Sequence, residues 1–373
     1  MVIMALDHVR DFMHISSMSG DPTNLETTTA LLFFTRWVTH LCAPTFVFLS
    51  GVSAYISFKR KGNISESRRF LLSRGIWLVI LEFTFINFAL WFDIYYRLLL
   101  MEVIAAIGLS FIVLSLLLKV QSRIIGAVGI IIIFGHNLLQ GLPLPENPLA
   151  AFAASVLLRP NLIQLTSATS FFSAYPLIPW LGILLAGFAC GEIFEMDEAK
   201  RKKIFLRTGI FTLSAFVIMR FLNFYGDPAQ WVEQKSTLFT FLSFINVTKY
   251  PPSLDFTLLF IGFTFLILYA SEKSNNRISN FFSVYGKVPL FYFIIHLYLI
   301  HLLMFVVLFI QGFGINDLVF GLFSNGRPKS GGGVGLAVIY LIWLAVVLVL
   351  YPVCLWYGNY KNSHKKNLLL RYL

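Results

Sequence analysis

The stretch FYFIIHLYLIHLLMFVVLFI, residues 291–310, decides the fold of this chain. It contains no Asp, Glu, Lys or Arg, and its 20 residues match the length that a helix needs to cross the hydrocarbon layer of a membrane. The whole chain of 373 residues is 57% hydrophobic and only 13% charged, which is far more apolar than a soluble domain. We therefore predict an integral membrane protein.

Together with this stretch, nine apolar runs occur along the sequence, near residues 30–58, 75–92, 98–118, 124–142, 175–194, 208–224, 252–271, 288–310 and 335–356. With a first span that ends near His14, they predict an all-α fold, a polytopic transmembrane helix bundle of about ten spans. We expect a single integral-membrane domain over residues 1–373. Only six residues precede Asp7, so we expect the first span to be truncated at its N-terminus.

The net charge of +11 comes from Lys and Arg residues that gather in short loops between the apolar runs. This distribution follows the positive-inside rule and predicts that both termini are cytoplasmic. The segments then expected to face outward are 15–29, 143–174, 225–251 and 311–334. Because membrane orientation explains the basic loops, we expect the lipid bilayer as a partner and no nucleic acid.

Ionisable side chains cluster in MALDHVRDFMH, residues 4–14. On a helix, Asp7, Arg10, Asp11 and His14 have the i, i+3, i+4, i+7 spacing of one face, and His8 can reach Asp11. A histidine held by a carboxylate is a suitable general base near neutral pH. The alternative interpretation is a salt-bridge ladder at the end of a span.

The second span, FFTRWVTHLCAPTFVFLSG (residues 33–51), places Arg36 and His40 one turn apart, with Pro44 to kink the helix. Ionisable groups inside a membrane usually line a cavity or pair with one another. Arg36 could hold an oxyanion or a phosphate. It could equally be the counter-ion of Asp7 or Asp11.

Other motifs restrict the chemistry. His296 and His301 are about 140° apart on a helix and cannot easily face one site. The sequence contains no HExxH motif, carboxylate-rich metal cluster, P-loop or GxSxG element, so we predict neither a metal centre, an ATPase nor a serine hydrolase.

Six blocks carry a resemblance to a known family: VIMALDHVRDF (2–12), FFTRWVTHLCAPTFVFLSGVSAYI (33–56), AIGLSFIVLSLL (106–117), YPLIPWLGILLAGFACG (175–191), NVTKYPPSL (246–254) and GKVPLFYFIIHLYLIH (286–301). In this order, the chain resembles bacterial members of the heparan-alpha-glucosaminide N-acetyltransferase catalytic family. The first two blocks and KYPPSL are the distinctive ones.

The resemblance implies a multi-pass membrane acyltransferase that moves an acyl group from cytosolic acetyl-CoA, a co-substrate, to a glycan or amino sugar across the membrane. It implies a bacterial cytoplasmic membrane and leaves a homodimer open. The basic loops Lys59–Arg74 and Lys200–Arg207 are candidates for attracting the nucleotide of CoA.

Carried over to this chain, the polar position that ends the family's first span falls on Asp7, with His8 beside it, and a later histidine falls on His296. Lysosomal relatives place the catalytic histidine after the first span, where this chain has His14. His8, His14 and His40 therefore stay open as the base.

The resulting hypothesis has His8 or His14 as base, oriented by Asp11, with Asp7 as a second catalytic carboxylate. The predicted substrate-binding side chains are Arg36, His40, Arg10, His296 and Trp180. The alternative is a proton-coupled transporter of a small solute, with a buried Asp, Arg and His relay and broken helices at Pro44, Pro176, Pro179 and Pro289.

Overall fold

The computed structural model describes residues 1–17, 20–141, 143, 145–274, 276–364, 367 and 370. Residues 18, 19 and 144 of the predicted outward segments lie outside this set. The chain divides into two compact units. Unit 1 comprises Met1–Cys42, Phe83–Leu98 and Ser274–Leu373, and unit 2 comprises Ala43–Glu82 and Leu99–Lys273.

The elements of unit 1 are α1 (Val2–Met13), α2 (Ala30–Thr39), α5 (Asn87–Trp91), α13 (Arg277–Lys287), α14 (Pro289–Ile310), the 3-10 turn η3 (Ile315–Asp317), β4 (Phe320–Gly321), β5 (Ser324–Asn325) and α15 (Leu336–Ser363). Helix α1 packs against α2, α14 and α15. Strands β4 and β5 form a short antiparallel pair. The centre of this unit is thus a helix that carries charges and is covered by three others.

The elements of unit 2 are α3 (Cys42–Lys61), α4 (Ile64–Leu81), β1 (Leu98–Met101), α6 (Val103–Leu117), α7 (Ser122–Gln140), α8 (Pro148–Leu157), β2 (Leu162–Gln164), β3 (Ser170–Ser173), α9 (Leu177–Cys190), η2 (Gly191–Glu195), α10 (Glu198–Leu222), α11 (Thr237–Ile245) and α12 (Leu254–Ser271). The π-helical turn η1 (Glu82–Ile86) lies at the boundary between the units.

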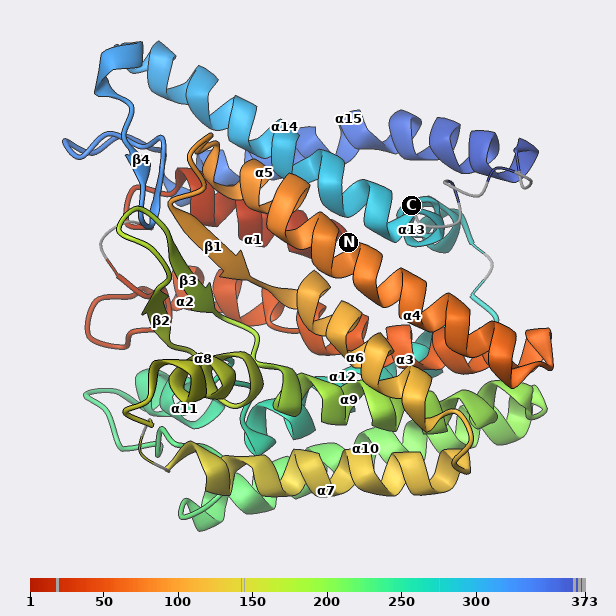
Figure 1. The fold of residues 1–373 in the computed structure, drawn as a ribbon. Helices are drawn as coiled ribbons and strands as arrows, with labels where there is room; N and C mark the ends of the chain where they lie inside the picture. Colours follow the sequence, from red (N-terminus) through yellow and green to blue (C-terminus); the bar gives the residue numbers. More distant parts are fainter. Residues whose placement is uncertain are drawn as a thin grey trace. The chain divides into compact units, whose positions relative to one another are not determined.

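Unit 2 is built from helix pairs: α4 with α6, α7 with α9, and α10 with α12. Figure 1 shows α7 and α9 side by side. Small residues allow the first pair to approach closely, since a Cβ at Gly75 would lie 2.5 Å from the Gly108 carbonyl oxygen. Close backbone approach at small residues is a main source of helix association in membranes. The strands of the small sheet lie in the order β1-β3-β2.

The prediction of an all-α polytopic bundle is confirmed, with 69% helix and 5% strand. In the described part of the chain, eight helical segments are long and apolar enough to cross a membrane. The predicted span 98–118 differs, because it begins as strand β1 and its helix α6 has only 15 residues. The single-domain organisation stays a prediction.

The predicted span 30–58 is interrupted near Pro44. Helix α2 ends at Thr39 and α3 begins at Cys42. Proline has no N–H to donate to the carbonyl four residues earlier, and its ring crowds that carbonyl. Here that residue is His40, which is the C-cap of α2. The proline thus accounts for the break between α2 and α3.

Candidate functional site

Helix α1 presents two different sides to its neighbours in unit 1. Its 12 residues contain no Gly or Pro, so the helix is uninterrupted through the ionisable cluster. Asp7, Arg10 and Asp11 share one side because of their i, i+3, i+4 spacing, whereas His8 is rotated by about 100° from Asp7. Since α1 packs against both α2 and α14, the two sets of side chains meet different helices.

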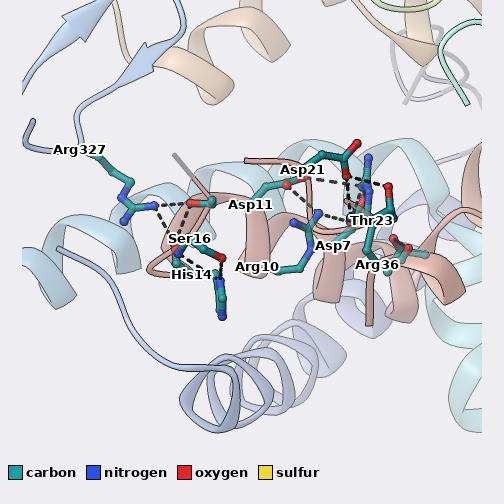
Figure 2. A network of polar contacts seen from close by, with 11 residues as sticks. Asp7, Arg10, Asp11, His14, Ser16, Asp21, Thr23, Arg36 and Arg327 are labelled. Atoms are coloured by element: carbon teal, nitrogen blue, oxygen red, sulfur yellow. Dashed lines mark hydrogen bonds and ion pairs between the residues drawn. The ribbon is translucent and has the colours of Figure 1, made fainter. Parts of the chain in front are cut away.

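The acidic side of α1 forms an ion-pair cluster with Arg36 of α2, shown in Figure 2. The Arg36 guanidinium donates to both carboxylate oxygens of Asp7 at 2.6 Å. Arg10 donates to Asp7 at 2.9 Å and to Asp11 at 2.7 Å. Arg36 and Asp11 approach to 3.9 Å. The predicted grouping of Asp7, Arg10 and Asp11 on one face, with Arg36 near them, is thus present.

This ion-pair cluster contains two carboxylates and two guanidinium groups, so its formal charges cancel. Arg10 is 1% exposed and Asp7 is 8% exposed, and buried charges require such pairing. The contacts support the counter-ion interpretation of Arg36. Within the described residues Asp11 pairs with Arg10 and Arg36, and its role in orienting His8 or His14 stays a prediction. The catalytic roles of Asp7 and Asp11 stay predictions.

His8, on the other side of α1, lies against His296 of α14. Their ring centroids are 5.1 Å apart with an interplanar angle of 61°. Phe293 packs edge-on against His8 at 6.4 Å. His8 is partly exposed, whereas His296 is fully buried. The structure therefore brings together two of the histidines that the sequence singled out.

The hydrogen bonds of His296 define its chemistry. Its Nδ1 lies 2.9 Å from the carbonyl oxygen of Tyr292, and because a carbonyl can only accept, Nδ1 donates. In the neutral ring, Nε2 then carries the lone pair. Among the described residues, no group hydrogen-bonds this buried Nε2. The Tyr292 ring stacks on the imidazole at 5.1 Å and fixes its plane. His296 thus offers one unused acceptor beside His8.

His14 follows the last residue of α1, outside the eight span-length helices. Its Nδ1 accepts from the Ser16 backbone N–H at 3.3 Å and lies 2.8 Å from Ser16 Oγ. Arg327, which is 2% exposed, donates to the His14 carbonyl at 2.9 Å (Figure 2). Burial, and then the charges of Arg10 and Arg327, lower the pKa of His14. Because local bonds already use its lone pair, His14 is the weaker candidate for a base.

The remaining predicted side chains have different surroundings. His40 is buried at the C-terminal end of α2. Trp180 is in unit 2, fully buried, with its ring 4.7 Å from that of Tyr175 and 6.4 Å from that of Phe256. These are core contacts for Trp180. Substrate binding by either residue stays a prediction.

His301, one and a half turns beyond His296, is held at both ring nitrogens. Nδ1 faces the Ala89 carbonyl and Nε2 the Asn325 carbonyl, each at 2.8 Å. Its ring also packs on Phe12 and Phe92. The two nitrogens connect α14 to other segments of unit 1. These contacts indicate a structural role for His301.

Sequence reasoning did not include Tyr292, Ser16 or Arg327. Tyr292 could have been found, since it lies four residues before His296 and i, i+4 side chains are neighbours on a helix. No sequence spacing indicates Arg327, because its contacts with His14 and Ser17 join segments that are more than 300 residues apart.

The basic loops proposed to attract CoA are partly neutralised in unit 2. Lys61 pairs with Glu66 at 2.7 Å, and Arg201 pairs with Glu272. Lys59 is 3.8 Å from Glu195. In the described part of the chain, no group of three or more His, Cys, Asp or Glu side chains is arranged to hold a metal ion.

Comparison with known proteins gives one family. The family model described as heparan-alpha-glucosaminide N-acetyltransferase, catalytic, matches residues 4–229, which is more than half of the chain. The match includes most of α1, all of α2 and most of unit 2. No curated protein matches the chain.

Proposed function

Since the chain belongs to the heparan-alpha-glucosaminide N-acetyltransferase catalytic family, we propose that it transfers an acetyl group from acetyl-CoA to an amino sugar or another glycan acceptor, with His8 as the general base. The family is one of acetyltransferases, and the apolar helices make this an integral membrane protein.

One observation carries the choice of base: His8 lies 5.1 Å from a fully buried histidine, His296, whose Nε2 bonds no described group. A base must keep its own lone pair accessible and its ring fixed. His8 is partly exposed, so a substrate can approach its ring, and packing against His296 and Phe293 limits the orientation of that ring. His8 also lies within the family match, which begins at residue 4.

The proposed reaction follows from acyl-transfer chemistry. The acceptor amine or hydroxyl attacks the carbonyl carbon of the thioester while His8 takes its proton. The tetrahedral intermediate collapses when the C–S bond breaks, and the proton on His8 passes to the thiolate, which leaves as free CoA. The new C–N or C–O bond holds the acetyl group, and His8 returns to its starting state.

His296 and the ion-pair cluster have positioning roles in this scheme. His296 packs against the His8 ring at 5.1 Å and so limits the orientation of the base. Arg36 and Arg10 hold Asp7 and thereby fix the rotation of α1, on which His8 lies. A fixed rotation matters because a small misplacement of a base costs rate steeply.

The proposed topology brings the donor from one side and the acceptor from the other. With both termini cytoplasmic, CoA approaches from the cytosol and the glycan from the outer face of a bacterial cytoplasmic membrane. The distribution of Lys and Arg supports this orientation. The end of α1, at His14, then lies toward the acceptor.

The test is acceptor-dependent release of free CoA by the purified chain in nanodiscs. Acetyl-CoA is supplied with glucosamine or a series of amino sugars, the thiol is measured optically, and the acetylated sugar is identified by mass spectrometry. We expect the wild type to release CoA when acceptor is present, and His8→Ala to lower the rate by about 100-fold or more, the usual range for loss of a general base.

The exposed His364 provides the matched control, and His364→Ala should retain the wild-type rate. His14→Ala separates the two candidate bases, since it should keep most of the activity. Acetyl-CoA that is neither bound nor consumed with any amino sugar, together with proton-coupled uptake of a solute by proteoliposomes, would favour the transporter alternative.

A further inference from the structure

The KYPPSL motif contains a lysine that the proposed chemistry does not use. Lys249 lies in the segment between α11 and α12 of unit 2 and is 7% exposed. Its ammonium nitrogen is 4.9 Å from the ring centroid of Tyr250 and 5.9 Å from that of Tyr175. The two rings meet edge to face at 5.5 Å. We refer to Tyr175, Lys249 and Tyr250 as the lysine notch.

Among the described residues, no carboxylate forms an ion pair with Lys249. Lysine is almost never buried unless it is paired, and cation–π contacts offset only part of the loss of hydration. Asp227, the acid bound to this segment, accepts instead from the Thr248 N–H and Oγ1 at 2.8 Å and from Ser253 Oγ at 2.6 Å. The notch therefore holds an uncompensated positive charge.

The backbone around Lys249 is held rigidly. Arg220 donates to the Asn246 carbonyl at 2.8 Å, and His136 Nε2 bonds the Pro252 carbonyl at 2.7 Å. The Ser253 N–H donates to the Thr248 carbonyl at 2.9 Å. Hydrogen bonds on both sides of the lysine keep it from moving out to water. A site fixed in this way loses little freedom when a ligand binds.

The aromatic part of the notch is also organised for a ligand. Tyr175 is 4% exposed and is stacked on the fully buried Trp180, whose indole N–H bonds no described residue. Tyr250 is 39% exposed and gives access from the surface. An aromatic face packs well against the apolar C–H face of a sugar ring, while the phenol edge tolerates polar groups.

From the charge, the rigidity and the aromatic face together, we infer that the lysine notch binds an acidic sugar, with Lys249 on its carboxylate, sulfate or phosphate and Tyr250 on its ring. The idea that this acidic sugar is the acceptor rests on the proposed acetyltransferase function. Binding of the sugar is measured without turnover, so the binding site and the proposed function can fail separately.

The test measures binding to the purified full chain in nanodiscs of neutral phosphatidylcholine, by saturation-transfer difference NMR with titration. The probes are glucuronic acid and N-acetylglucosamine 6-phosphate, compared with glucose and N-acetylglucosamine. We expect the acidic sugars to bind at least about tenfold more tightly, as expected for one charge-assisted hydrogen bond. Lys249→Met should remove this preference, and Lys249→Arg should keep it.

Lys235→Met is the matched control, because Lys235 is exposed in the same predicted outward segment, and it should change nothing. Tyr250→Ala removes an exposed ring and should weaken the binding of all four sugars without unfolding the chain. Equal binding of acidic and neutral sugars, or an unchanged preference in Lys249→Met, overturns the inference. Displacement of the acidic sugars by phosphatidylglycerol, at the same phosphate concentration, would also overturn the inference. It would assign the lysine notch to lipid headgroups.

Discussion

Each unit buries an arginine near aspartates, and the two arginines are bound in different ways. Arg10 of unit 1 is 1% exposed, and its partners are the carboxylates of Asp7 and Asp11. Arg220 of unit 2 is 2% exposed and donates to four backbone carbonyls, those of Phe244, Ala229, Ser243 and Asn246. Its nearest carboxylate, Asp255, is 3.8 Å away.

The difference separates a charge cluster from a loop anchor. In unit 1, charge balances charge, and the helix that carries the cluster also carries His8. In unit 2, Arg220 fixes the backbone after α10 and at the C-terminal end of α11, and four of its five N–H groups donate to carbonyls. A buried arginine by itself therefore does not mark a reaction site. The spare acceptor on His296, beside the partly exposed His8, is what distinguishes unit 1.

Arg220→Met should have the largest effect on stability. The substitution removes four N–H donors and leaves four backbone carbonyls without these partners. Each buried carbonyl without a partner costs about 1–3 kcal/mol. We therefore expect a loss of about 4 kcal/mol or more in the free energy of unfolding. Steric trapping in bicelles measures this quantity. A loss below about 1 kcal/mol would mean that water or other donors replace the guanidinium and that the anchor interpretation is wrong.

Asp7→Asn should have a somewhat smaller effect. It keeps the shape of the side chain but leaves Arg36 and Arg10 with one carboxylate between them, and breaking a buried ion pair costs about 3 kcal/mol. The same unfolding measurement applies, with Glu26→Gln as an exposed control. Unchanged stability would show that the ion-pair cluster does not hold α1 to α2.

Asp255→Asn sharpens the contrast with Asp7→Asn. Because Arg220 is already satisfied by carbonyls and Asp255 lies at 3.8 Å, removing this charge also removes a desolvation cost. We expect a change of less than about 1 kcal/mol in the free energy of unfolding. If Asp255→Asn costs as much as Asp7→Asn, the two clusters are alike and the comparison fails.

The smallest expected effect is a dependence of stability on pH near His14. Its pKa is lowered in the folded chain by burial and by Arg10 and Arg327, so the unfolded state binds the proton more readily. The contribution of His14 to the free energy of unfolding is then fully present above pH 6.5, the unperturbed pKa of histidine. It decreases as the pH falls below this value. His14→Gln should flatten this part of the stability curve. A curve that is the same in both proteins would contradict the assignment.

The sequence predicts those features that depend on local spacing. The helical positions of Asp7, Arg10 and Asp11 are enough to place them together, and Arg36 is the nearest basic residue that an adjoining helix can offer. Apolar length identifies most spans. It fails at residues 98–101, because a short apolar run reads the same as strand or helix, and β1 is a strand there.

The contacts that define the candidate base lie beyond such reasoning. His8 and His296 are 288 positions apart in the sequence, and nothing in their spacing places one beside the other. The pairing of Asp11 with two arginines likewise depends on packing between helices. Competing partners of one carboxylate can be ranked only when their distances are known.

The most direct test of the central claim, that His8 and His296 act as one unit, is a double-mutant cycle on acceptor-dependent CoA release. The variants are His8→Ala, His296→Asn, which retains a donor toward the Tyr292 carbonyl, and the double variant. If His296 works only through His8, the His296→Asn rate falls by about tenfold and the double variant is no slower than His8→Ala. Independent, multiplying losses, or a His296→Asn variant with the wild-type rate, would contradict the claim.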